Sequence, residues 1–209
     1  MPEFLKESIK NLAQFAIWEI EESEDELSEG LTISRVEKKK LNLLKSNVHR
    51  KGYLATRQLL KKLGIPPGSN KYDQNGAPYL IDGRYLSITH SRNFAAVAVS
   101  DKKVGIDLEF YREKIKKIGP RFLNIEETET SQDFTDIKYL TKIWTAKEAL
   151  YKIYSKPGIN FKSQLHIQKS SKSSSIGFGS VYDKGKTFIY NLYFRYYEKF
   201  CLSLATSKF

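Results

Sequence analysis

The stretch VGIDLEF, residues 104 to 110, carries the alternation that decides this part of the fold. Apolar residues take every second position, and Gly105, Asp107 and Glu109 lie between them. This alternation is typical of a β-strand with one buried face, so both carboxylates point to the same side. Neighbouring like charges disfavour the fully ionised state. The face is therefore either solvated or shared with a divalent cation, and the strand alone leaves both readings open.

A second segment, IWTAKEALYK at 143 to 152, predicts one face of a helix. The residues that follow helical spacing on this face are Trp144, Lys147, Glu148, Tyr151 and Lys152. Such a face with aromatic residues is also typical of a plain amphipathic helix. In that case the Glu148–Lys152 pair contributes only about 0.2–0.5 kcal/mol.

The two segments together favour a metal site. Asp107, Glu109 and Glu148 supply carboxylate oxygens from a strand and a helix, and magnesium prefers such ligands together with water and phosphate oxygens. Nearby lysines would balance phosphate charge. The residues alone therefore predict a magnesium site that handles a diphosphate or a nucleotide.

A third segment, RYLSITHS at 84 to 91, places His90 at the end of a predicted strand. Ser87, Thr89 and Ser91 surround it in the sequence, and such a hydroxyl cluster would donate hydrogen bonds to a phosphate. The alternative is a histidine that is structural or simply exposed.

Working outward, the chain alternates short strands with helices. Before residue 102 we expect a strand at 13 to 21, an acidic loop through Gly30, two helices between 34 and 63 with a break near Asn47, and short strands at 78 to 81, 84 to 90 and 93 to 100. Ser34 and Glu37 predict a capping box. After residue 102 we expect a strand to 110, helices at 112 to 122 and 134 to 154, and strands at 164 to 169, 175 to 182, 187 to 197 and 199 to 206. This order predicts an α+β fold divided near residue 102.

Bulk properties predict a soluble, cytoplasmic protein. The 209 residues are 40% apolar, and the single cysteine, Cys201, excludes an internal disulfide, as expected in a reducing compartment. No signal peptide and no apolar run of transmembrane length is evident, so we expect no membrane association.

The charge is uneven along the chain. The formal net charge is +11; residues 19 to 29 hold seven acids and no base, whereas residues 35 to 71 hold eleven Lys or Arg and one acid, Glu37. Such a field attracts an anionic partner such as nucleic acid, a membrane surface, a phosphorylated ligand or an acidic protein. Ordinary solvated helix faces are the alternative.

These residues resemble the 4′-phosphopantetheinyl transferases, which move phosphopantetheine from coenzyme A to a serine of a carrier protein. VGIDLE and WTAKEALYK match two motifs of that family in order and spacing, and SITHS resembles a third. HRKGYLATRQLLKKLG resembles the arginine helix of the family's first lobe. The resemblance runs from about residue 48 to 165.

The chain length is closer to the two-lobed, Sfp-type class. This resemblance implies a pseudodimer of two similar lobes, each a small antiparallel sheet packed with helices. The lobes would span 1 to 102 and 103 to 209, with the active site between them. It also implies a monomer that takes part in fatty acid or secondary metabolite biosynthesis, with an acidic acyl or peptidyl carrier protein and coenzyme A as partners and with no nucleic acid.

The resemblance also implies roles for single residues. Asp107, Glu109 and Glu148 would hold Mg²⁺, or Mn²⁺, with the coenzyme A diphosphate. Glu148 would be the base for the carrier serine, directly or through a water, and Lys152 would stabilise the leaving group. The implied coenzyme A contacts are Lys147, Thr89, His90 and either Arg50 or Arg57, and Glu127 fits a loosely defined acidic position.

Two positions depart from the family pattern. Ala77 stands where the family often has a lysine that contacts coenzyme A, and Lys71 is a candidate substitute. Thr89 replaces the serine before the histidine. The alternatives are a non-catalytic binder of coenzyme A or carrier with the same fold, and a basic nucleic-acid-binding protein, although no nucleic-acid motif is present.

Overall fold

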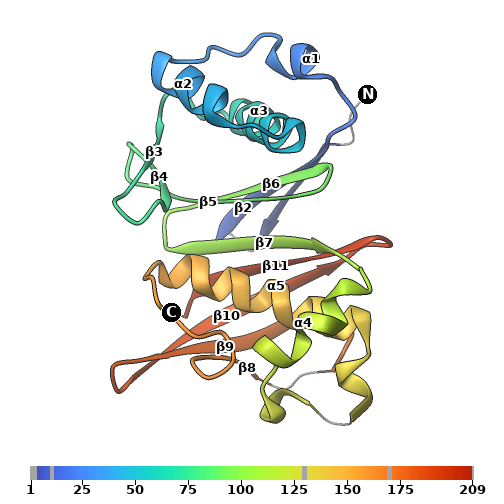
Figure 1. The fold of residues 1–209 in the computed structure, drawn as a ribbon. Coiled ribbons are helices and arrows are strands. Elements are labelled where there is room, and N and C mark those ends of the chain that lie inside the picture. Colours follow the sequence, from blue (N-terminus) through green and yellow to red (C-terminus); the bar gives the residue numbers. More distant parts are fainter. Residues whose placement is uncertain (1–3, 10–11, 129–130, 169–170, 209) are drawn as a thin grey trace. The chain divides into compact units, whose positions relative to one another are not determined.

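The computed structural model describes residues 4–9, 12–128, 131–168 and 171–208 (Figure 1). The chain divides into two compact units, Met1–Asp101 and Lys102–Phe209. Each unit combines one antiparallel sheet with helices, so the chain is α+β, as predicted. No helix within the described residues is both long and apolar enough to cross a membrane.

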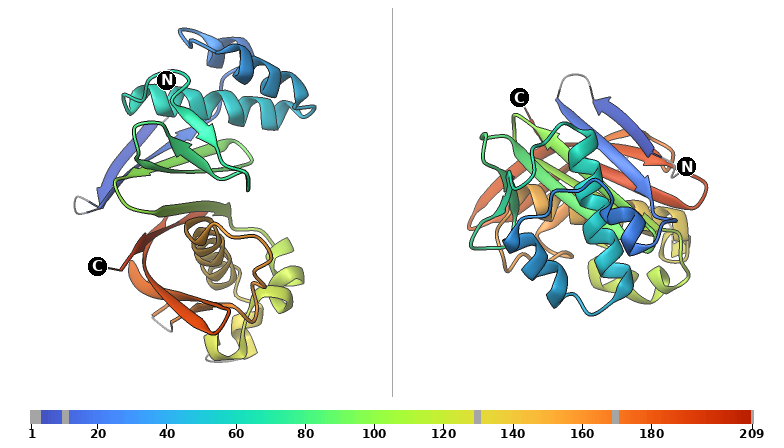
Figure 2. Two further views of the ribbon diagram at one scale, coloured as in Figure 1. Left: turned by 90° about the vertical axis from the view of Figure 1, so that its left-hand side faces the viewer. Right: turned by 90° about the horizontal axis from the view of Figure 1, so that it is seen from above.

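The first unit contains a six-stranded sheet with the order β1-β2-β6-β5-β4-β3. Its elements are β1 Phe4–Ile9, β2 Ala13–Glu19, α1 Glu24–Ser28, α2 Arg35–Leu43, α3 Asn47–Lys62, β3 Asn70–Tyr72, β4 Pro78–Leu80, β5 Tyr85–Ser91 and β6 Phe94–Ser100. Helix α3 lies across one face of the sheet (Figure 2). Its Leu54 and Leu59 enter a core with Trp18 and Val97. Burial of these apolar side chains holds helix and sheet together.

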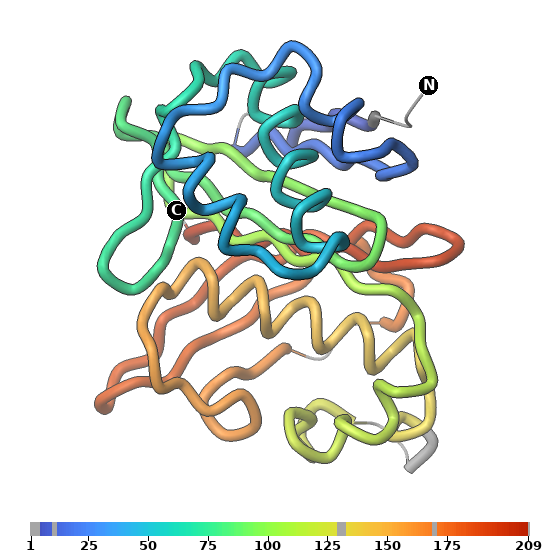
Figure 3. The backbone as a smooth tube through the Cα atoms, turned by 45° about the horizontal axis from the view of Figure 1, so that its top comes forward, coloured from blue at the N-terminus to red at the C-terminus, as the bar shows by residue number. Residues whose placement is uncertain are grey.

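The second unit contains a five-stranded sheet with the order β7-β11-β10-β9-β8. Its elements are β7 Val104–Phe110, α4 Lys114–Phe122, the 3₁₀ helices η1 Ile125–Glu127 and η2 Ser131–Phe134, α5 Ile137–Tyr154, β8 Leu165–Ile167, β9 Ile176–Asp183, β10 Lys186–Tyr196 and β11 Phe200–Ser207. Helix α5 runs along this sheet (Figure 3). Its Leu140, Ile143 and Leu150 pack with Val181 and Leu192. This packing sets α5, which carries the second motif, against the strand that carries the first.

Local sequence signals explain where two of the longer helices begin. The Ser34 side chain accepts from the Glu37 N–H and the Glu37 carboxylate accepts at Ser34, so the predicted capping box starts α2. Asp136 caps α5, which therefore begins three residues after the predicted start. The last residue of the strand predicted at 164 to 169 lies outside the described residues.

The expectation of an acidic loop in the first unit was wrong. The acidic segment after β2 is not all loop, because Ser23 and Glu26 form a second capping box that starts the short helix α1. Strand β1 was not predicted either. Its sequence, FLKESI, lacks a clean alternation, and the strand forms by pairing along its whole length with β2.

Candidate active site

Strand β7 presents its acidic residues to α5. A Cβ atom built on Gly105 would lie 2.1 Å from the Ala149 carbonyl oxygen, so Gly105 allows the strand and the helix to approach closely. Asp107 and Glu109 follow at intervals of two and therefore point to the same side. The absent side chain at Gly105 is what brings the carboxylates of β7 within reach of α5.

The second motif holds α5 in place through several contacts. The Trp144 ring packs between Phe122 and Phe161, with centroid distances of 5.0 and 5.4 Å. On another side of the helix, the Thr145 hydroxyl bonds the Ser203 hydroxyl at 2.7 Å, and both residues are fully buried. Ser203 pairs with Asp107 across β11 and β7. Trp144 and Thr145 thus fix the helix on two sides.

Lys152 joins the helix directly to the first motif. Its ammonium donates to the Asp107 carboxylate at 2.8 Å and to the Ile106 carbonyl oxygen at 2.9 Å. An ammonium has three N–H donors. Within the described part of the chain, one Lys152 donor therefore remains for a further acceptor such as a phosphate oxygen.

Glu148 has a different environment from its neighbours in the motif. Its carboxylate is half-buried and forms no hydrogen bond or ion pair with any described residue. Burial raises the pKa of Glu148 to about 7, and repulsion by Asp107 and Glu109 adds to the rise, whereas Lys152 opposes it. The structure therefore brings Glu148 into electrostatic contact with the other two predicted carboxylates.

These carboxylates do not form a ready-made metal cluster. Among the described residues, no three His, Cys, Asp or Glu side chains gather closely enough to hold an ion. Asp107 is paired with Lys152, and Glu109 with Arg112 at 3.0 Å. The donor chemistry still fits a hard cation, because Asp107 and Glu109 both repel the Glu148 carboxylate, which has no partner among the described residues. A cation would relieve that repulsion once Glu109 turned from Arg112.

Lys147, an expected coenzyme A contact, is bonded inside the second unit. Its side chain is fully buried, and its ammonium donates to the Phe122 and Phe161 carbonyl oxygens and pairs with Glu127 at 2.9 Å. These partners occupy all three donors. Glu127 accordingly acts as the buried partner of Lys147, a role that spacing along the chain did not reveal.

His90 and the three hydroxyls next to it in the sequence lie on different faces of β5. Strand alternation puts the hydroxyls of Ser87, Thr89 and Ser91 on the face opposite His90. His90 lies on the α3 side, where its ring meets His49 edge-on at 5.6 Å between centroids, and a Cβ on Gly52 would touch it at 3.4 Å. The roles of Thr89 and His90 towards coenzyme A therefore stay separate predictions.

Both candidate arginines are paired within the first unit. Arg50 makes a bidentate pair with Glu24 and donates to the Leu41 carbonyl oxygen. Arg57 is buried, lies 3.3 Å from Glu37 and stacks on Tyr53. The acidic segment thus neutralises part of the basic run, and contacts alone do not select either arginine.

The position of the missing lysine is a tight polar turn. The Asp73 carboxylate accepts from the backbone N–H groups of Asn75 and Ala77, so the turn holds itself closed without a cation. Lys71, the candidate substitute, is exposed on β3. Its contact with coenzyme A stays a prediction.

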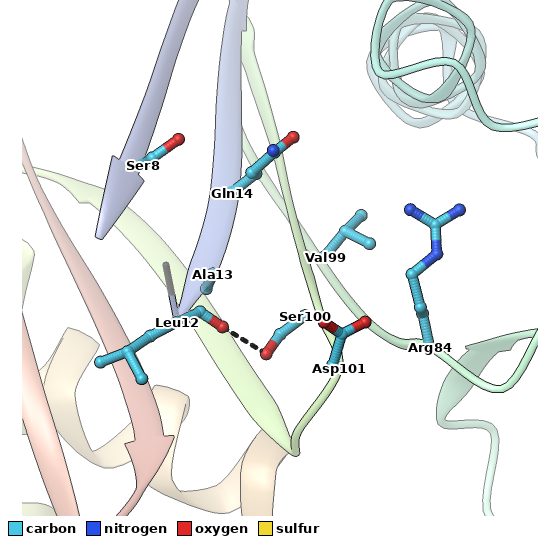
Figure 4. A pocket seen from close by; sticks show the side chains of 8 residues that line it. All are labelled: Ser8, Leu12, Ala13, Gln14, Arg84, Val99, Ser100 and Asp101. Atoms are coloured by element: carbon cyan, nitrogen blue, oxygen red, sulfur yellow. Dashed lines mark hydrogen bonds between the residues drawn. The ribbon is translucent and has the colours of Figure 1, made fainter. Parts of the chain in front are cut away.

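A hollow of about 190 Å³ lies elsewhere in the first unit (Figure 4). Arg84, Gln14 and Asp101 line it, and the Ser100 hydroxyl donates to the Leu12 carbonyl oxygen at its edge. None of the predicted site residues lies in its wall. It is therefore not the predicted site.

Three contacts of the site were not expected from the sequence. These are the Arg112–Glu109 pair, the Thr145–Ser203 hydrogen bond and the Lys147–Glu127 pair. Arg112 lies three residues after Glu109, just beyond the end of β7. Ser203 and Glu127 reach α5 through the fold alone, so no sequence spacing identifies them.

A comparison with models of protein families matches the part of the chain that holds β7 and α5. Residues 103–205, which hold β7, α5 and nearly all of the second unit, match the model of the 4′-phosphopantetheinyl transferase superfamily. No curated protein matches the chain.

Proposed function

Through residues 103–205 the chain belongs to the 4′-phosphopantetheinyl transferase superfamily, and we propose that it acts as a holo-[carrier protein] synthase. In this reaction a carrier serine attacks the diphosphate of coenzyme A. A new serine O–P bond forms, the P–O bond within the diphosphate breaks, and adenosine 3′,5′-bisphosphate leaves. The superfamily match supports phosphopantetheine transfer in general, and the site geometry supports the assignment of roles.

The unpaired carboxylate of Glu148 carries this proposal. A serine hydroxyl is a weak nucleophile, and a base works best when its pKa lies near the working pH. In the metal-free chain burial raises the pKa of Glu148 to about 7, and a bound cation would lower it again. Glu148 would accept the serine proton, directly or through a water.

Lys152 is suited to the charge that develops on the leaving group. Its contacts with Asp107 and Ile106 point the ammonium into the carboxylate site, and its remaining donor would reach a phosphate oxygen. A positioned donor of this kind stabilises the transition state. Fully bonded Lys147 has no such capacity.

Asp107, Glu109 and Glu148 would hold Mg²⁺ or Mn²⁺. Such an ion, when bound, neutralises diphosphate charge and polarises the phosphorus centre. Glu109 would have to exchange its Arg112 contact for the ion. The partners would be coenzyme A and an acidic acyl or peptidyl carrier protein, with the enzyme acting as a monomer in the cytoplasm.

Release of adenosine 3′,5′-bisphosphate tests the proposal. The chain is incubated with coenzyme A, magnesium and apo-carrier protein, and the nucleotide is quantified by chromatography. We expect release only when carrier and metal are both present. Release without carrier would indicate hydrolysis, and binding of coenzyme A without release from any carrier would favour the non-catalytic alternative.

A further inference from the structure

The buried Lys147–Glu127 pair ties three separate segments of the second unit to α5: residues 122–127, the loop at Phe161 and strand β8 at Ile167. The Lys147 ammonium bonds the end of α4 at Phe122 and the loop at Phe161. The Glu127 carboxylate accepts from the backbone N–H groups of Asn124 and Ile167. Both side chains are almost fully enclosed, at 0% and 2% exposure.

The pair is saturated on both sides. Each Lys147 donor has an acceptor, and both Glu127 oxygens accept hydrogen bonds. A buried ion pair is seldom more stabilising than apolar side chains of similar volume, but it tolerates only one geometry. The pair is therefore better suited to fixing a position than to adding stability.

That position bears directly on Glu148. Consecutive helical residues point about 100° apart around the axis. Glu148 follows Lys147 and therefore points about 100° further around α5, where its carboxylate is close enough to Asp107 and Glu109 of β7 to be repelled by them. A rotation of α5 that freed Lys147 would carry Glu148 away from Asp107.

We infer that Lys147 and Glu127 are positioning residues that set the rotation of α5 and so hold Glu148 beside Asp107. The rotation of α5 is a property of the fold. The expected effect of a wrong rotation on metal binding rests on the proposed function. Partners that orient metal ligands typically influence metal affinity or activity by about 10–100-fold.

Two measurements test the inference in a Trp18→Phe background, where Trp144 is the sole tryptophan. The variants are Glu127→Gln, Lys147→Met and the double variant Lys147→Met/Glu127→Leu. Lys147→Met alone leaves the buried Glu127 carboxylate without its ammonium partner. If that loss prevents folding, the double variant, which removes both charges, replaces it. The control is Lys162→Met. Lys162 is exposed, lies next to Phe161 in the loop that Lys147 bonds, and donates to the Pro120 carbonyl oxygen. Trp144 emission reports the rotation, and electron paramagnetic resonance reports Mn²⁺ binding in the presence of coenzyme A.

We expect Glu127→Gln and the double variant to shift Trp144 emission and to weaken Mn²⁺ binding about tenfold or more, with metal-free coenzyme A binding unchanged. Lys162→Met should match the parent. Unchanged Trp144 emission or unchanged Mn²⁺ binding in Glu127→Gln would overturn the inference. Weaker coenzyme A binding without metal in Lys147→Met, but not in Glu127→Gln, would also overturn it, because Lys147 would then contact coenzyme A directly. If the parent neither binds Mn²⁺ nor transfers phosphopantetheine, the proposed function fails, and Trp144 emission alone decides the role of the pair.

Discussion

Glu148 shows how one residue's surroundings set its chemistry. Its neighbours Lys147 and Lys152 are both bonded, whereas its own carboxylate has no partner among the described residues. Burial and the nearby Asp107 and Glu109 carboxylates disfavour its ionised form. The same surroundings that destabilise this charge prepare it to take a proton or a cation.

A pH dependence of stability follows from Glu148 in the metal-free chain. Its pKa rises on folding from 4.5 to about 7, so the folded state binds more protons between these values and stability falls as the pH rises through them. The shift corresponds to about 3 kcal/mol at most. Urea unfolding in the presence of a chelator measures the free energy of unfolding at pH 4.5 and at pH 8. This free energy should fall more between the two pH values for the wild type than for Glu148→Gln. Equal losses would show that the pKa is not raised.

Lys152→Met should impair turnover more than coenzyme A binding. The change removes an ammonium bonded to Asp107 and the donor assigned to the leaving group. Loss of one such donor typically lowers kcat by about 10²–10³-fold. The control is Lys156→Met, which removes an exposed lysine just beyond the end of α5. A Lys152→Met enzyme with wild-type kcat would remove Lys152 from the mechanism.

At the scale of elements, the contact between β7 and α5 sets the geometry of the site. A methyl group at Gly105 would meet the Ala149 carbonyl oxygen and lie 2.8 Å from the Ile153 nitrogen, and backbone atoms cannot turn aside as a side chain can. The helix would have to move away from the strand, and Glu148 would move with it.

Gly105→Ala should therefore destabilise the chain and weaken metal binding together. Overpacking of this kind costs about 1–3 kcal/mol, sometimes more. Thermal unfolding and Mn²⁺ titration measure the two effects. The matched control is Gly52→Ala in α3, where the nearest contact is an ordinary 3.4 Å to the His90 ring and the helix gains from alanine. A Gly105→Ala chain as stable as the wild type would contradict the close approach.

Element prediction succeeded where the local pattern was strong. The alternation in β7 and the long periodic run of α5 placed both motifs, and the Ser34 capping box located α2. Helix α1 was missed because its many acids suggested a solvated loop, although Ser23 and Glu26 carried a usable signal. Strand β1 had no such signal, since pairing with β2 supplies its order.

The candidate site was predicted in part for the same reason. Asp107, Glu109, Glu148 and Lys152 come together because two strong local elements pack on each other. The burial of Lys147 could not be predicted, because it depends on where η1 and the Phe161 loop fold back. The face of His90 was available from strand alternation, which separates it from the neighbouring hydroxyls.

At the scale of the whole molecule, net charge governs encounter with partners. The chain carries +11, although Glu24 and Glu37 neutralise two of its arginines internally. A positive surface speeds association with an acidic carrier, and salt screens that attraction. The KM for carrier should therefore rise between 50 and 300 mM salt, by about tenfold, with kcat nearly unchanged. A KM for carrier that ignores salt would separate the charge from carrier docking.

Intact mass spectrometry of an apo-carrier protein tests the central claim most directly. The carrier is incubated with coenzyme A, magnesium and either the wild-type chain or Glu148→Gln, whose folding is verified by circular dichroism. We expect the wild type to add one phosphopantetheine to the carrier serine, and Glu148→Gln to add it at least a hundredfold more slowly. A carrier left unmodified by the wild type, across acyl and peptidyl carriers, or modified equally fast by both chains, would contradict the account.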